Sequence, residues 1–403
     1  MVFALGAVGL AVVLTTAAML GPSRAVGPVQ TRSPAPDEVV AKVDPVRTVD
    51  AVGPARTVDA VGPSDAVGPI DADAALAAAL TAARRHVEAS RRQGDPRFLG
   101  RAQAALAPWW DAAAPPDEVL LLRATIRQGL HDFAAARVDL DALIGHRPDD
   151  VQALLTRAVV ATVQGDLARA TADCARVGAL AGELLGLTCA APLASRDGGA
   201  RAAFDRLGAL TAAAPRGPVA VWATTARAEL ARALDDDRAA ERLLRAALAV
   251  TPDDPYALAV LADLLLDGGR PDEVDAMLRD AQAETLVLRR AIALRRLGKP
   301  EAAALAARLR GEIDASAARG DDTHLRERAR YFLDVAPDAA MAVAAARGNW
   351  NLQREAIDVR TLLEAAAAAH DPAAAAPALI WIDAGGIDDA VLTRARARLE
   401  GGR

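Results

Sequence analysis

Apolar residues recur at a helical period from residue 71 to the end of the chain, with breaks every 12–18 residues. Small or helix-breaking residues keep a pitch of twelve, as in Ala124, Ala136 and Pro148, and again in Ala228, Ala240 and Pro252. A second pitch of 34 leads from Ala124 to Ala158, from Ala136 to Ala170, and from Ala228 to Ala262. The pattern therefore predicts pairs of helices that repeat about every 34 residues.

The residues at these positions suit helical hairpins. Two helices approach closely only where each contributes a small side chain to the contact. The turns keep the same pitch and use residues that leave a helix easily: His131-Asp132, Gly165-Asp166, Asp235-Asp236 and Gly269-Arg270. Because one hairpin cannot bury its own apolar face, neighbouring hairpins must stack. We therefore predict an all-α solenoid of stacked antiparallel hairpins.

With this spacing the chain resembles the tetratricopeptide repeat (TPR) family. The best units are 117–150, 151–184, 221–254 and 255–288; weaker ones are 71–108, 183–215, 284–313, 323–350 and 355–385, with a closing helix at 387–399. The resemblance implies a right-handed superhelix that binds a protein or peptide partner and is not an enzyme. Leu120, Leu154 and Leu258 stand where the family usually has aromatic residues. Another α-hairpin solenoid with a looser period is the alternative fold.

An apolar segment begins the chain. Residues 2–20 carry no charge, and about 19 residues in a helix span roughly 28 Å, close to the thickness of a bilayer core. Ser23-Arg24-Ala25 places small residues where a signal peptidase reads them, although a basic start is missing. We predict that residues 1–25 are a signal peptide or a membrane anchor, with a buried apolar helix as the alternative. The protein is then exported, periplasmic or membrane-anchored, facing outside the cytoplasm.

Residues 26–70 have the composition of a spacer, rich in Pro, Val, Asp and Gly. The segment 47–54 returns as 56–63, which gives a nine-residue repeat. Each Gly-Pro in it interrupts both a helix and a strand ladder. We predict a disordered linker at 26–70 and a TPR-like helical repeat domain at 71–403.

Charge and motifs exclude several classes of function. The 47 basic and 53 acidic residues give a net charge of −6, which argues against nucleic-acid binding. The five histidines form no metal-binding pair, and no phosphate-binding loop or Gly-x-Ser-x-Gly motif occurs. We predict no catalytic residue, cofactor or metal. The alternatives are an enzyme with an unrecognised acidic site and a structural envelope protein without a dedicated ligand.

The alternating Arg326, Arg328 and Arg330 are interpreted as spread over different helix faces.

The first helices of stacked hairpins line the concave side of the array. Their faces away from the small contact residues carry the predicted partner-binding residues: Thr125, Gln128, Trp222, Thr225, Glu229, Arg232, Tyr256 and Asp263. This mixture of aromatic and polar groups suits an extended peptide. Trp222 and Tyr256 could instead fill gaps between repeats.

Two cysteines lie on either side of a predicted turn near Ala181-Gly182. Cys174 and Cys189 are each about seven residues from that turn, so antiparallel helices would set them side by side. We predict a disulfide if the domain is extracytoplasmic, which closes a loop of about 15 residues and contributes roughly 3 kcal/mol. The alternative is two buried thiols in an ordinary core.

Overall fold

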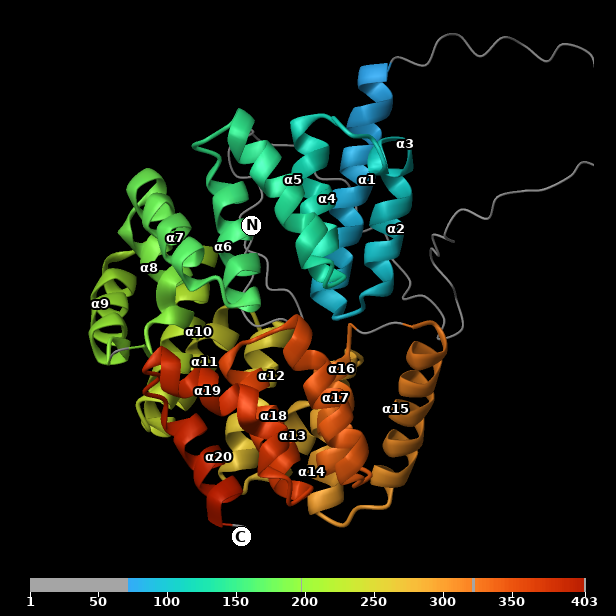
Figure 1. Ribbon diagram of the computed structural model, residues 1–403, viewed down its shortest axis with the longest axis vertical. Helices are drawn as coiled ribbons and strands as arrows, with labels where there is room; N and C mark the ends of the chain where they lie inside the picture. The colour runs from blue at the N-terminus through green and yellow to red at the C-terminus, as the bar shows by residue number, and fades with distance from the viewer. Residues whose placement is uncertain (1–71, 197, 321–322, 402–403) are drawn as a thin grey trace, which may run out of the picture.

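The computed structural model describes residues 72–196, 198–320 and 323–401, which fold almost entirely into helices (Figure 1). Strand-like pairing within these ranges is limited to one isolated antiparallel bridge between Arg196 and Ile387. The predicted all-α class is therefore confirmed. The predicted apolar segment at 2–20 and the linker at 26–70 lie outside the described residues. No helix in the described ranges combines the length and apolar character that a membrane crossing requires.

The helices follow one another as antiparallel pairs joined by short connections (Figure 1). The first half of the domain contains α1 (Ala72–Gln93), α2 (Arg97–Ala105), α3 (Ala107–Trp110), α4 (Asp117–Gly129), α5 (Phe133–His146), α6 (Val151–Gln164), α7 (Leu167–Ala181), α8 (Glu183–Ala190), the 3₁₀ turn η2 (Ala191–Leu193) and α9 (Ala200–Ala213). The predicted units 117–150 and 151–184 correspond to the hairpins α4–α5 and α6–α7.

The second half continues the same alternation. It contains α10 (Pro218–Ala233), α11 (Asp237–Val250), α12 (Pro255–Asp267), α13 (Pro271–Met277), α14 (Glu284–Arg296), α15 (Glu301–Ala318), α16 (Leu325–Asp334), α17 (Ala339–Leu352), α18 (Ala356–Ala368), η3 (Pro372–Ala375), α19 (Ala376–Gly385) and α20 (Ala390–Gly401). The predicted units 221–254 and 255–288 begin on α10 and α12, and the predicted closing helix is α20.

A left-handed residue followed by an aspartate forms the turn of several hairpins. The φ angles are 61° at His131, 79° at Gly165, 62° at Asp235 and 52° at His370. The next residue, Asp132, Asp166, Asp236 or Asp371, accepts a hydrogen bond from a backbone N–H in the first turn that follows. The first residue ends one helix and the aspartate caps the next, which explains why such pairs recur at the turns.

Alanine lines the contact between the two helices of a hairpin, which we call the hairpin seam. The pairs Ala124 and Ala136, Ala158 and Ala170, and Ala228 and Ala240 are at most 1% exposed. Their small side chains let the helix backbones approach closely. Larger buried residues of the second helices, such as Leu140 and Leu244, pack in the apolar clusters around these seams.

The array curves until its C-terminal hairpins lie against helices from its middle (Figure 1). The backbone N–H of Arg354 donates to the carbonyl of Val163 at 2.8 Å, and that of Asp388 donates to the carbonyl of Ser195 at 2.7 Å. We call the contact of α10 and α12 with α16, α18 and α20 the closing seam. The inner faces of these helices therefore meet one another, which corrects the expectation that they line an open groove.

Candidate functional site

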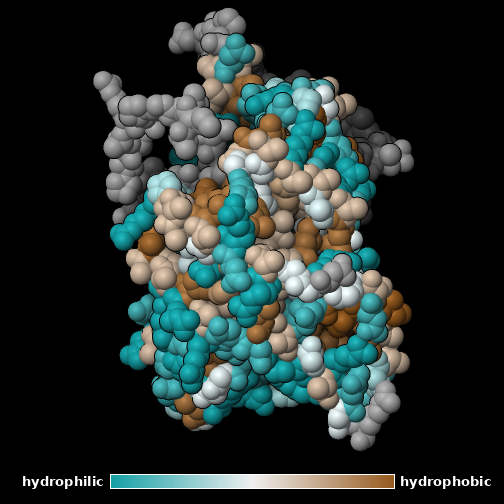
Figure 2. Space-filling view, turned by 90° about the vertical axis from the view of Figure 1, so that its left-hand side faces the viewer, coloured by the Kyte–Doolittle hydropathy of each residue, from teal (hydrophilic) through white to brown (hydrophobic). Residues whose placement is uncertain are grey.

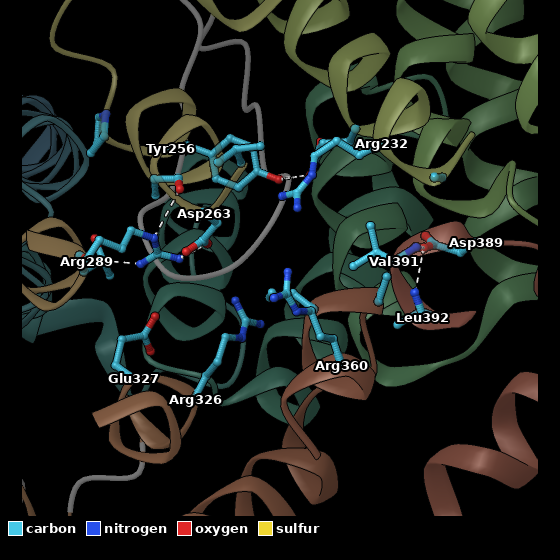
Figure 3. Close-up of a pocket in the computed structure, with 18 residues that line it drawn as sticks. Arg232, Tyr256, Asp263, Arg289, Arg326, Glu327, Arg360, Asp389, Val391 and Leu392 are labelled. Atoms are coloured by element: carbon cyan, nitrogen blue, oxygen red, sulfur yellow. Dashed lines mark hydrogen bonds and ion pairs between the residues drawn. The ribbon is translucent and has the colours of Figure 1, made fainter. Parts of the chain in front are cut away.

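A cavity of about 160 Å³ lies inside the closing seam (Figure 3). Its walls come from α10, α12, α14, α16, α18 and the start of α20, so it exists only because the array closes on itself. In Figure 3 the side chains of Arg232 and Arg360 reach toward this space from opposite sides. The polar lining consists of Glu229, Arg232, Tyr256, Asp263, Thr285, Arg289, Arg326, Glu327, Arg360 and Asp389, and the larger apolar side chains are Val260, Ile357, Val391 and Leu392.

Asp263 of α12 is held between two arginines. Arg289 donates to it at 2.6 Å, and Arg330 donates to its other oxygen at 3.3 Å. Burial alone would raise the pKa of Asp263, but the two guanidinium groups outweigh it and hold that pKa well below its usual range. Asp263 is therefore ionised and committed to its partners, so it is not a free base.

Asp267, one turn further along α12, also accepts hydrogen bonds from two arginines. Arg360 donates to its two oxygens at 2.6 and 2.7 Å, and Arg232 donates to it at 2.6 Å. Burial acts to raise the pKa of Asp267, but Arg360 and Arg232 lower it overall. The Nε of Arg232 is buried and has no hydrogen-bond partner. The carboxylate of Asp237 lies 3.9 Å from it, which is too far for a hydrogen bond.

Glu229 of α10 is a weaker acid than an ordinary carboxyl group. Burial raises its pKa to about 7, although the hydrogen bond from the Tyr256 hydroxyl opposes this shift. Burial and the neighbouring Glu229 raise the pKa of Tyr256 well above its usual value. Near neutral pH, Glu229 is therefore partly protonated and able to donate a hydrogen bond.

A second carboxyl cluster lies where α18 begins. Arg326 donates to Asp358 at 2.6 Å and to Glu355 at 3.3 Å, while the side-chain amide of Asn349 donates to Asp358 at 2.7 Å. Burial raises the pKa of Glu355 to about 8, and repulsion from Asp358 adds to that effect. The closing seam thus contains two carboxyl groups, Glu229 and Glu355, that hold protons to unusually high pH.

Four of the predicted partner-binding residues are buried in helix packing, namely Thr125, Gln128, Trp222 and Thr225. Trp222 belongs to an apolar cluster with Leu154 of α6 and Leu185 of α8. Neighbouring helices cover this side of the array, so the expectation that these four side chains face a partner is corrected. Trp222 instead fills a gap between repeats, which was the alternative considered for it.

The other four predicted residues, Glu229, Arg232, Tyr256 and Asp263, line the cavity together. Sequence reasoning missed their partners Arg289, Arg330 and Arg360. It also interpreted Arg326 and Arg330 as lying on different faces, although residues four apart share one helix face. Both arginines in fact bind carboxylates of the closing seam. The four-residue spacing of Arg326 and Arg330 was the signal in the sequence that could have placed both on one helix face.

A larger groove lies outside the closing seam, between the α1–α2 turn and helices α12 to α16. Its volume is about 1200 Å³, and its lining includes the partly exposed apolar residues Leu258, Met277 and Ile313. Two lining side chains keep a buried polar atom without a hydrogen-bond partner, the Nε of Arg328 and one carboxylate oxygen of Glu312. On the face that carries α7, α8 and α9, hydrophobic residues gather across the upper middle and hydrophilic residues predominate below them (Figure 2).

Cys174 of α7 and Cys189 of α8 are joined by a disulfide, with their Cα atoms 5.4 Å apart. The helices can approach this closely because glycines face each other beside the bond. A Cβ added to Gly186 would lie 2.5 Å from the Cα of Gly178, so a larger residue would push the helices apart. The link falls where the sequence predicted it.

Within the described ranges, no cluster of three or more His, Cys, Asp or Glu is placed to hold a metal ion. No protein-family model and no curated protein matches the chain. The chain is similar to the solved structure of a TPR protein from Parabacteroides merdae, with 16% identity and a TM-score of 0.38 over 60% of this chain and 94% of that chain.

The chain is also similar to the TPR domain of P58(IPK), with 17% identity and a TM-score of 0.23 over 79% of this chain and 98% of that chain. The arrangement of the helices itself defines the class of this protein. Antiparallel α-hairpins that follow one another every 29–41 residues and stack in chain order define an α-hairpin repeat protein.

Proposed function

We propose that this protein is a non-catalytic scaffold that binds an extended segment of a partner protein in the groove between the α1–α2 turn and α12 to α16. The observation that carries the proposal is the groove itself, which offers apolar side chains and both kinds of unfilled hydrogen-bonding group. The Nε of Arg328 lacks an acceptor, and one oxygen of Glu312 lacks a donor, while its other oxygen accepts from Arg308 at 3.0 Å. An extended backbone supplies a carbonyl and an N–H together, and its alternate side chains can contact Leu258, Met277 and Ile313.

Site-specific photocrosslinking in the native cell tests this function. A photoreactive residue at Met277 in the groove should form adducts with one partner, whereas the same residue at Val138, which is 67% exposed on α5, should not. Arg328→Glu should reduce the adduct at Met277. Equal adducts from both positions, or an adduct with this chain's own residues 26–70, would argue against a partner protein in the groove.

We further propose that the protein works outside the cytoplasm, where residues 1–25 direct it and residues 2–20 can tether it to the membrane. The uncharged segment 2–20 and the pair Cys174 and Cys189 support this location, because disulfides persist in oxidising compartments. Fractionation of cells followed by mass spectrometry of the two cysteines tests it. Recovery from the cytoplasm with both thiols free would contradict it.

Acid catalysis at the cavity is a second candidate function, which the raised pKa of Glu229 favours. Asp263, which also lines the cavity, is fully engaged with Arg289 and Arg330, so it is not available as a second catalytic carboxylate. Screening the protein against nitrophenyl glycosides and esters tests this alternative. Turnover that disappears in Glu229→Gln would favour the enzyme over the scaffold.

A further inference from the structure

The cavity of the closing seam has the size and the mixed lining of a small-molecule site. Its volume of about 160 Å³ resembles that of an engineered apolar cavity that holds one benzene molecule, about 150 Å³. Val260, Val391 and Leu392 supply apolar surface, while Arg232 and Tyr256 supply polar groups. Pockets that bind small ligands combine these features, with apolar walls and a few placed polar groups.

Arg232 is the least completely paired of the arginines around this cavity. The carboxyl group of Asp389, which also lines it, accepts from the backbone N–H groups of Val391 and Leu392 at 2.8 and 3.1 Å. Arg232 and Arg360 share the single carboxylate of Asp267, and Arg289 and Arg330 share that of Asp263. Arg330 and Arg360 have second acidic partners one turn away, in Asp334 and Glu364. Arg232 has no such second partner at hydrogen-bond distance, and its Nε has no acceptor. The α10 wall of the cavity therefore carries an unfilled charged donor.

Glu229 lies one helical turn before Arg232 and lines the same wall. It accepts a hydrogen bond from Tyr256, and its raised pKa leaves it partly protonated near neutral pH. In that form it neither neutralises Arg232 nor repels an anion. This wall thus carries a guanidinium whose Nε needs an acceptor, next to a carboxyl group that is partly protonated near neutral pH.

We propose that the cavity binds a small organic carboxylate whose apolar body is no larger than one six-membered ring. The carboxylate accepts from Arg232, after a rotation of the guanidinium, and the apolar body lies against Val391 and Leu392. Because the walls come from both sides of the closing seam, the bound anion links α10 to α20 and stabilises the closed array. This inference does not depend on the proposed scaffold function, since the partner groove lies elsewhere.

Calorimetric titration of the full chain at pH 6 tests the proposal. The probes are acetate, butyrate and benzoate, each paired with its neutral amide as a control of equal shape. At least one carboxylate should bind about tenfold more tightly than its amide, as a hydrogen bond to a charged group predicts. Arg232→Gln should abolish this preference, whereas Arg245→Gln on the exposed outer pair with Glu273 should keep it.

A second variant keeps the test decisive if Arg232→Gln unfolds the chain. Val391→Trp fills the cavity without changing any charge and should abolish binding of every probe, while circular dichroism checks that the array remains helical. Three results would overturn the proposal: no carboxylate binds more tightly than its amide, the preference survives in both cavity variants, or inorganic phosphate binds where the carboxylates do not.

Discussion

The hairpin seams and the closing seam bury helix contacts by opposite means. The hairpin seams use alanine, as in Ala124 and Ala136, whose side chains are completely buried and carry nothing that must be paired. The closing seam uses arginines and carboxylates, as in Arg330 with Asp263. Alanine contacts depend on shape alone. A buried charge that loses its partner, by contrast, leaves a desolvation cost of several kilocalories per mole that lowers the stability of the fold. Substitutions should therefore destabilise the two seams for different reasons: loss of a charge partner in the closing seam, and a change of side-chain size in the hairpin seams.

Removing a shared carboxylate should have the largest effect. Asp263→Ala leaves the guanidinium groups of Arg289 and Arg330 buried without the anion between them, and we expect a loss of about 3–5 kcal/mol in the free energy of unfolding. Urea denaturation measures it. The matched control is Asp314→Ala, which removes an exposed pair with Arg310 and should cost about 0.5 kcal/mol or less. Equal effects would mean that the closing seam is not buried in solution.

The closing seam should also make stability depend on pH. The pKa of Glu229 is about 7 in the folded chain and near 4.5 when unfolded, so between these values the folded state holds the extra proton. Its contribution is present at pH 4.5 and is lost as the pH rises to about 7, by about 2–3 kcal/mol. Glu355, with a pKa of about 8, acts in the same direction.

Denaturation at pH 5, 6, 7 and 8 should show this decline in stability. Glu229→Gln should flatten it, because the amide cannot ionise, whereas Glu118→Gln on the exposed side of α4 should not. A profile that stays the same in Glu229→Gln would show that this carboxyl titrates normally.

A hairpin seam should respond to size rather than charge. Ala136→Leu inserts three carbons where the helices of α4–α5 touch, and we expect a loss of about 1–3 kcal/mol. Ala134→Leu, two residues earlier on the exposed face, serves as the control and should be nearly neutral. If both variants are equally stable in thermal denaturation, the alanine spacing does not mark a close contact.

The smallest expected effect lies at a turn. His370 is exposed with a φ of 52°, a conformation that glycine adopts without steric strain. His370→Gly should stabilise the chain by about 0.5 kcal/mol, after allowing for the greater freedom of glycine in the unfolded state. Ala303→Gly on the exposed face of α15 should instead destabilise it by about 1 kcal/mol. Thermal denaturation separates the two signs.

The hairpins could be predicted from the sequence because their determinants are local and repeat. The alanine pitch, the turn pairs such as Gly165-Asp166, and the two cysteines all act within about 34 residues of one another. The closing seam could not be predicted in this way. Arg330 reaches Asp263 across 67 residues and Arg360 reaches Asp267 across 93, and neither pair recurs along the chain. Four of the cavity residues were found because they lie on first helices, but their arginine partners carry no periodic signal.

Closure removes a freedom that open arrays of repeats retain. An open stack can gain or lose a unit at little expense, because each unit touches only its neighbours. In this protein an inserted or deleted hairpin between α12 and α18 would carry Arg360 away from Asp267 and Arg354 away from Val163. The architecture consequently fixes the number of repeats. Homologous domains should therefore differ in length only through longer loops.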